Sequence, residues 1–451
     1  MSKESALSGR AREHLLSRVA SMRNMENASA PQRVELARGS AKYTDFTTLP
    51  GYDDLRLQRS IGEKLGLANP YFRMHDGRNA ARTQMGGREV LNFSSYDYLG
   101  LNGHPEVLET AKIALDRYAV SASASRHVAG ERPVHRSLEK ALAQHYNAED
   151  ALVFVSGYAT NVSVIGQLCG AKDLILTDAA SHNSAVMGAV LSGASRRNFL
   201  HNNLDNLESI LSSVRNKFER VLIFVEGLYS MDGDYPDLPR LIEIKKRYHA
   251  WLMVDEAHAL GVLGKQGHGL FEHYNVDPRE VDIWMGTMSK TLSGCGGYIA
   301  GAGAMVDYLR LTAGAFVFSV GMPPVIAASV EKSLELMHRE PERVARLQHN
   351  SRYFVEYAKK KGLDTGLGMG TAVAPIIIGD SIATVIMSQE LLNRGINVLP
   401  VLYPAVPVKS SRLRFFLTAM HTEQDIETAI DTTVDELAKI PARMQSIKVQ
   451  A

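Results

Sequence analysis

Short apolar runs alternate with amphipathic stretches through the middle of the chain. Val134–Tyr146 and Leu207–Phe218 repeat apolar residues at helical spacing. The uninterrupted apolar runs are Leu152–Val155, Leu174–Leu176, Val221–Val225, Trp251–Val254, Ile283–Trp284 and Tyr298–Ala300. Continuous apolar strands joined by helices are typical of a mostly parallel sheet covered by helices on both faces. We therefore predict an α/β fold with such a sheet at its centre.

The same pattern divides the chain into three parts. They are an N-terminal helical arm or accessory segment (1–90), a large domain (91–322) and a smaller C-terminal α+β domain (323–451). In the first part, Ala11–Met25 has helical spacing, whereas Asn27–Gly51 is interrupted by Pro, Gly and Thr. In the last part, a long helical stretch follows Pro324, and strands are expected at Ala374–Ile378 and Leu413–Leu417.

Composition excludes several classes of protein. The 451 residues are 45% hydrophobic and 22% charged, and a net charge of +1 gives no indication of nucleic acid or acidic membranes as partners. The apolar runs are too short to span a bilayer, and the N-terminus lacks the apolar core of a signal peptide. Cys169 and Cys295 form neither a disulfide framework nor a CxxC pair. We therefore expect a cytoplasmic protein without a transmembrane segment.

Lys290 carries the most specific chemical signal. It lies in a loop rich in small residues, and the earlier apolar run that begins at Trp251 ends in Asp255 and His258. A lysine that forms a Schiff base and an acid that keeps a pyridine nitrogen protonated are the two protein groups that pyridoxal phosphate (PLP) requires. Glycine and hydroxyl residues in this loop and at Ser156–Tyr158 suit the phosphate of that cofactor. Since ligands bind past the carboxyl ends of parallel strands, we predict a PLP site here.

Two other interpretations of these residues are rejected. Asp255–His258 spells the DEAH box of helicases, but no P-loop precedes it. His127, His135 and His145 lack the companion ligands of a zinc site, so no metal is expected.

Seven motifs together resemble those of the α-oxoamine synthases, which are PLP-dependent enzymes of fold type I. The motifs are Asn92–Gly100, Ser156–Asn161, Asp178–His182, Glu226–Gly233, Asp255–His258, Gly286–Lys290 and Arg412–Phe415. The family includes 8-amino-7-oxononanoate synthase, 2-amino-3-ketobutyrate CoA ligase, 5-aminolevulinate synthase and serine palmitoyltransferase. The motifs are most similar to those of serine palmitoyltransferase-like members. The resemblance implies the PLP-dependent transferase fold of type I for the large domain.

The resemblance also implies roles for individual residues. Lys290 would hold PLP as a Schiff base, and Asp255 would bind the pyridine nitrogen. His182 would stack on the ring and assist proton transfer, and His258 would lie near the phenolic oxygen. Beside these four catalytic residues, the cofactor would be bound by Ser156, Gly157, Tyr158, Glu226, Ser230, Thr287, Ser289 and Ser319.

Substrate contacts and a partner subunit are implied as well. Arg414 matches the arginine that binds the carboxylate of the amino acid, and Arg412 is its rival. Ser319 matches a hydroxyl residue that reaches the phosphate of the neighbouring subunit, which implies a homodimer. Tyr96 replaces the Asn of many members and is typical of serine palmitoyltransferases. Ser125 stands where aminolevulinate synthases carry a Thr that restricts them to glycine, so both positions favour an amino acid with a side chain.

The implied reaction is a decarboxylating condensation that gives an α-amino ketone. A small L-amino acid, serine first and alanine second, would react with an acyl thioester, either acyl-CoA or an acyl carrier protein, in sphingolipid or secondary-metabolite biosynthesis. The alternatives are a glycine-using synthase of the same family, another fold-type I enzyme such as an aminotransferase, and an inactive partner subunit, against which Lys290 argues. The arm at residues 1–90 would either cover an acyl tunnel or meet an acyl carrier protein, or it is an ordinary dimer arm.

Overall fold

The computed structural model describes residues 41–64 and 66–450, which belong to two compact units. One unit ends at Gly66, and the other begins at Leu67 and holds three sheets. Among the described residues, no helix has both the length and the apolar character needed to cross a bilayer. The predicted boundaries between the three parts of the chain stay predictions.

The first unit is described from Ala41 onward. It contains two 3₁₀ turns, η1 (Ala41–Thr44) and η2 (Phe46–Thr48), followed by helix α2 (Tyr52–Lys64). The helix expected at Ala11–Met25 lies outside the described residues.

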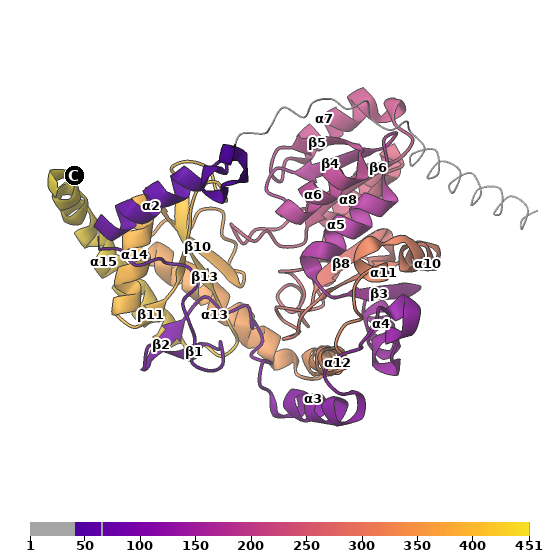
Figure 1. The fold of residues 1–451 in the computed structure, drawn as a ribbon, viewed down its shortest axis with the longest axis horizontal. Helices are drawn as coiled ribbons and strands as arrows, with labels where there is room; N and C mark the ends of the chain where they lie inside the picture. Colours follow the sequence, from indigo (N-terminus) through magenta and orange to yellow (C-terminus); the bar gives the residue numbers. More distant parts are fainter. Residues whose placement is uncertain (1–40, 65, 451) are drawn as a thin grey trace, which may run out of the picture. The chain divides into compact units, whose positions relative to one another are not determined.

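The second unit is built on a seven-stranded sheet with the strand order β3-β9-β8-β7-β6-β4-β5 (Figure 1). All strands run in one direction except β9, which is antiparallel to both of its neighbours. The strands are β3 (Asp150–Phe154), β4 (Leu174–Asp178), β5 (Ser195–Phe199), β6 (Val221–Glu226), β7 (Trp251–Asp255), β8 (Ile283–Thr287) and β9 (Gly297–Gly301). The predicted α/β fold is confirmed, and each predicted apolar run forms a strand.

Strand β5 was not predicted, because its sequence has no apolar pattern. It reads Ser-Arg-Arg-Asn-Phe, and of these five residues only Phe199 is buried. The strand lies at the edge of the sheet and pairs with β4 alone. An edge strand with polar side chains is stable because its neighbour supplies the backbone hydrogen bonds, and the charges on it discourage pairing with other chains.

Both faces of the sheet are buried, which explains the continuous apolar runs. In β6, Leu222 and Phe224 join one buried cluster, whereas Val221, Ile223 and Val225 join the other. The first cluster includes α5 (Gly157–Leu168), α6 (Asn183–Ser192), α10 (Gly303–Thr312) and α11 (Gly314–Val317). The second includes α3 (Pro105–Tyr118), α4 (Pro133–His145), α7 (Leu204–Val214), α8 (Leu238–Tyr248) and α12 (Pro324–Arg339).

The strands of the C-terminal part, together with two strands that precede the large sheet in the sequence, form two smaller sheets. Their strands are β10 (Val373–Gly379), β13 (Ser411–Phe416) and β12 (Leu399–Val401) in one sheet, and β1 (Arg82–Met85), β2 (Arg88–Asn92) and β11 (Ile396–Asn397) in the other. The helices of this part are α13 (Pro341–Lys360), α14 (Ser381–Asn393) and α15 (Glu423–Gln450). The remaining short helices are η3 (Arg126–Gly130), η4 (Arg215–Lys217), α9 (Leu270–His273) and η5 (Pro278–Glu280).

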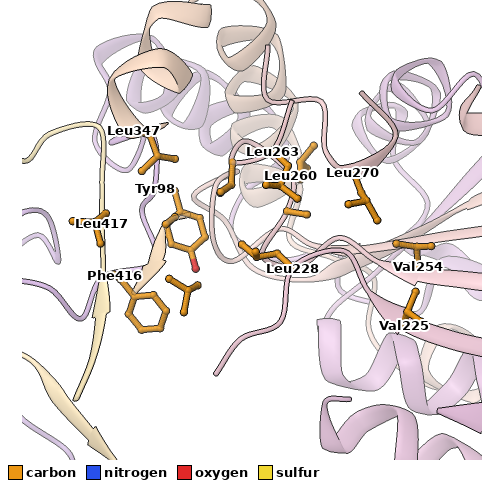
Figure 2. Packing of buried hydrophobic residues seen from close by; sticks show 14 of the residues in the cluster. Tyr98, Val225, Leu228, Val254, Leu260, Leu263, Leu270, Leu347, Phe416 and Leu417 are labelled. Carbon is orange, nitrogen blue, oxygen red and sulfur yellow. The ribbon is translucent and has the colours of Figure 1, made fainter. Parts of the chain in front are cut away.

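One apolar cluster joins β13 to the large sheet. Figure 2 shows Phe416, the last residue of this strand, and Leu417, which follows it, near Tyr98, with Leu260 and Leu228 on the side of the large sheet. The ring centroids of Tyr98 and Phe416 are 6.3 Å apart. Burying these large side chains together holds β13 beside the carboxyl ends of the parallel strands.

Candidate active site

The predicted site residues gather where the parallel strands end. Ser156 follows β3, His182 follows β4, Glu226 and Asp255 are the last residues of β6 and β7, and Lys290 follows β8. These strands run in the same direction, so their carboxyl ends lie at one edge of the sheet. Residues from five separate segments therefore meet at this edge.

Lys290 is half-buried, and burial lowers the pKa of its amine to about 8. The negative charge of Asp255 opposes this effect but does not cancel it. The Nζ atom lies 5.7 Å from the centroid of the Tyr96 ring. A substantial fraction of the amine is therefore neutral near physiological pH, as a nucleophile or base requires.

A chain of hydrogen bonds connects Asp255 to His182. The amide of Asn161 donates through Nδ2 to Asp255 Oδ2 over 2.8 Å and to Ser184 Oγ over 2.9 Å. Ser184 Oγ lies 2.7 Å from His182 Nδ1, which also accepts from the Ser184 amide. Because the backbone amide can only donate, Nδ1 is the unprotonated nitrogen, and the proton of the neutral ring lies on Nε2. Asn161 and Ser184 were not predicted as site residues, although the Ser156–Asn161 motif contains the first of them.

Glu226 is a buried acid opposite Asp255 in the β6–β7 register. Burial and then repulsion by Asp255 raise the pKa of Glu226 to about 8. Its Oε1 accepts from the backbone amide of His182 over 2.6 Å. Glu226 is thus mainly protonated at neutral pH, so it positions His182 without adding a second full negative charge beside Asp255.

His258 is held by Tyr98, a residue that was not predicted as part of the site. The Tyr98 hydroxyl and His258 Nδ1 are 2.7 Å apart, and both side chains are buried. Burial, with repulsion from Lys290 and Arg414, places the pKa of His258 well below its usual range. The imidazole is therefore neutral. The signal for Tyr98 was its position in the Asn92–Gly100 motif.

Polar groups of helix α5 and of the end of β8 lie next to each other. Helix α5 begins at Gly157 with Ser156 as its N-cap, so the amides of Gly157 and Tyr158 have no acceptor within the helix. Thr287 Oγ1 lies 2.8 Å from Ser289 Oγ. A Cβ atom at Gly157 would come within 2.9 Å of Thr287 Oγ1, so a larger residue would fill the space between the two segments. Helix N-termini and hydroxyl groups are typical ligands of phosphate.

The two candidate arginines differ in their partners. Arg412 is buried and paired with Asp232, with 2.5 Å between Nη1 and Oδ1. Arg414 is half-buried, donates through Nη1 to the Ser230 carbonyl over 2.9 Å and lies over the Phe416 ring. Among the described residues, no carboxylate forms an ion pair with Arg414, so its guanidinium retains the capacity to bind one.

The structure brings Tyr96 next to Lys290. Ser125 and Ser319 lie on two other segments, which contact each other. Tyr96 packs edge-on against Phe416, with 4.8 Å between ring centroids, and faces Lys290. The segments of Ser125 and Ser319 adjoin each other, since the Gly321 amide donates to the Ala124 carbonyl over 2.9 Å. Within the described part of the chain, neither serine hydroxyl has a hydrogen-bond partner.

Comparison with known proteins finds relatives over most of the chain. Residues 88–432 match the family Aminotransferase class I and II. The 8-amino-7-oxononanoate synthase of Symbiobacterium thermophilum is 37% identical over 77% of this chain and 88% of its own length. The 4-hydroxy-2,2'-bipyrrole-5-methanol synthase PigH of Serratia sp. is 40% identical over 76% of this chain, which is 52% of its own length. A solved serine palmitoyltransferase of S. paucimobilis with a bound PLP–myriocin aldimine has a TM-score of 0.84 and 26% identity, covering 88% of this chain and all of that chain.

Proposed function

We propose that this chain, which belongs to the aminotransferase class I and II family and within it to the α-oxoamine synthases, condenses a small L-amino acid with an acyl thioester. The amino acid loses carbon dioxide, and the product is an α-amino ketone. One observation carries the proposal: Lys290 and Asp255 lie at the carboxyl edge of the large sheet, and Arg414 of β13 reaches this edge through its hydrogen bond to the Ser230 carbonyl. Among the described residues, the Arg414 guanidinium has no carboxylate partner. This arrangement provides a nucleophilic amine, a buried acid and a binding group for a carboxylate.

PLP, the cofactor of this family, fits the residues present. Because Gly157 has no side chain, space remains between the start of α5 and Thr287. The amides of Gly157 and Tyr158 and the hydroxyls of Thr287 and Ser289 would hold the phosphate there. Asp255 would hold the ring nitrogen, and Lys290 would hold the aldehyde carbon. When bound, PLP supplies an electron sink that stabilises negative charge at the α-carbon of the amino acid.

The side chains around this position are suited to moving protons. With its pKa lowered to about 8, Lys290 can take the α-proton near neutral pH and return it later. His182 presents a proton on Nε2, since its other ring nitrogen accepts the hydrogen bonds from Ser184. Asn161 and the amide of Ala257, 2.9 Å from Oδ1, orient the Asp255 carboxylate, which would face the ring nitrogen.

We propose serine or alanine as the amino acid, and expect mass spectrometry of the products to show it. The enzyme is offered glycine, L-alanine and L-serine, each with acyl-CoA and with an acyl carrier protein thioester of several chain lengths. Serine or alanine should give α-amino ketones with release of carbon dioxide, because Tyr96, which faces Lys290, is typical of members that accept a side chain. Turnover of glycine alone would contradict the choice of amino acid. Amino-group transfer to a keto acid without condensation would contradict the proposed reaction.

A partner subunit is part of the proposal. Phe318 is 88% exposed and Val128 79% exposed, and the segments that carry them adjoin where Gly321 contacts Ala124. Large apolar side chains exposed together mark an interaction surface. The unpartnered hydroxyl of Ser319 lies beside Phe318, so we propose that a second copy of the chain covers this surface and receives that hydroxyl at its phosphate site.

Replacing both Phe318 and Val128 with aspartate should convert a dimer into a monomer of 49.5 kDa. Dimerisation would then have to bury two unpaired carboxylates, which costs free energy and opposes association. Analytical ultracentrifugation measures the mass, and PLP affinity should fall together with dimerisation. Ile113→Asp, at a residue 60% exposed on α3, is the matched control and should leave the dimer intact. A wild-type monomer that is fully active at high dilution would refute the dimer.

We also propose a cytoplasmic location. Both cysteines of the chain, Cys169 and Cys295, are free thiols in the structure. Free thiols are typical of a reducing compartment.

A further inference from the structure

His201 is a charged group that the proposed reaction does not use. It follows strand β5, and its side chain is 22% exposed. Its Nδ1 lies 2.8 Å from Asp178 Oδ1, and its Nε2 lies 2.9 Å from Asp234 Oδ2. The carboxylate of Asp178 is fully buried and that of Asp234 is 7% exposed. The rings of His201 and Tyr229 pack in a T-shaped arrangement, with 4.5 Å between their centroids.

Both ring nitrogens of His201 donate. An ionised carboxylate only accepts hydrogen bonds, so an imidazole between two carboxylates is satisfied only when both nitrogens carry protons. The hydrogen bonds and charges of Asp178 and Asp234 outweigh burial and raise the pKa of His201 to about 10. The side chain is therefore an imidazolium that partly neutralises two buried acids.

Each aspartate holds a segment of the active site. Asp178 ends β4 and accepts from the amide of Ala180, in the loop that leads to His182. Asp234 ends the segment that begins at Glu226, and its carbonyl accepts from the amide of Tyr229. That segment includes Ser230, whose carbonyl accepts from Arg414. Through its two hydrogen bonds, His201 connects the loop of His182 to the segment that orients Arg414.

We propose that His201 is a positioning residue, whose imidazolium between Asp178 and Asp234 sets the place of Arg414 relative to His182. The inference rests on the proposed function, because it assigns the effect to binding of the amino-acid carboxylate. A merely structural role would instead weaken stability, PLP binding and amino-acid binding together. The positioning role predicts a selective loss of amino-acid affinity that depends on Arg414.

The test compares His201→Gln, His201→Arg and the matched control His349→Gln. Glutamine is neutral and cannot reach both carboxylates, whereas arginine restores a charged group with several donors. His349 also contacts a carboxylate, 2.6 Å from Glu423 Oε1, but it is exposed on α13. Dissociation constants of L-alanine and L-serine are measured by absorbance titration of the PLP-loaded enzyme, and PLP affinity is measured separately.

We expect His201→Gln to weaken amino-acid binding about tenfold and PLP binding less than about threefold, a loss within the usual range for coupled residues. His201→Arg should restore most of the affinity, and His349→Gln should change neither constant. Adding His201→Gln to Arg414→Ala should cause little further loss, because the two residues act through one contact. Independent losses in the double variant, or equal losses of PLP and amino-acid affinity, would overturn the proposal.

Histidine-selective ¹⁵N NMR of the wild-type protein provides a second measurement, which reports the protonation of the His201 ring directly. Both nitrogens of His201, assigned by the loss of its signals in His201→Arg, should be protonated from neutral pH to above pH 8. A ring with one unprotonated nitrogen in this range would overturn the proposal. If wild-type enzyme bound neither PLP nor any amino acid, the proposed function would fail, and this spectrum would still report the charge of His201.

Discussion

Lys290→Ala should abolish turnover and leave only weak PLP binding. Lys290 is the only lysine placed at the strand edge among the described residues, and no other described amine can replace it as nucleophile and base. A general acid–base group alone contributes about 10²–10⁴-fold in rate, so we expect at least this loss in kcat. Weak PLP binding should remain, because the phosphate contacts proposed for Gly157, Tyr158 and Thr287 do not involve the lysine.

Borohydride reduction followed by peptide mapping provides the direct measurement. The pyridoxyl group should be found on Lys290 Nζ in the wild-type protein and on no peptide of the variant. Lys265→Ala, at an exposed lysine, is the matched control and should retain full activity. A reduced cofactor mapped to another lysine would refute the assignment.

The lowered pKa of Lys290 adds a dependence on pH. The neutral amine is the form that attacks the cofactor aldehyde, and it predominates above the pKa of about 8. Reconstitution of cofactor-free enzyme with PLP should therefore accelerate as pH rises through about 8 and level off above it. A rate that continued to rise to about pH 10.4, the ordinary lysine value, would show that burial does not act on this amine.

Arg414→Ala should weaken amino-acid binding by about ten- to a hundredfold. A charge-assisted, bidentate contact between guanidinium and carboxylate is worth about 1.5–3 kcal/mol. PLP affinity should change little, since the groups proposed to hold the phosphate come from α5 and β8. Absorbance titration of the PLP-loaded enzyme with L-alanine and L-serine measures the effect, and Arg414→Lys should show an intermediate loss because it keeps the charge without the planar fork.

Arg412→Ala is the control for this prediction. Arg412 is buried and already paired with Asp232, so its loss should lower the melting temperature and leave the half-buried Asp232 carboxylate unpaired. The dissociation constant of the amino acid should rise much less than in Arg414→Ala. The opposite ranking of the two variants would transfer carboxylate binding to Arg412.

The central strands of the large sheet were predictable because both of their faces are buried against apolar side chains. In β6 and β7, every residue packs against helices or neighbouring strands, so nearly all are apolar and the runs are unbroken. Strand β5 escaped prediction, because an edge strand takes its hydrogen bonds from β4 and keeps polar side chains in solvent. Local sequence carries no record of a partner strand that lies elsewhere in the chain.

Residue type and local motif were sufficient to propose Lys290, Asp255 and Gly157 as site residues, because a Schiff-base lysine, an acid and a tight phosphate loop allow few substitutes. The choice between Arg412 and Arg414 needed the fold, since both lie on β13, two residues apart. Only the tertiary structure places Asp232 against one of them. The bridge from Asp178 through His201 to Asp234 likewise joins three separate segments. Chemistry carried by one residue type can be read along the chain, but a hydrogen bond between distant segments exists only after their backbones are packed together.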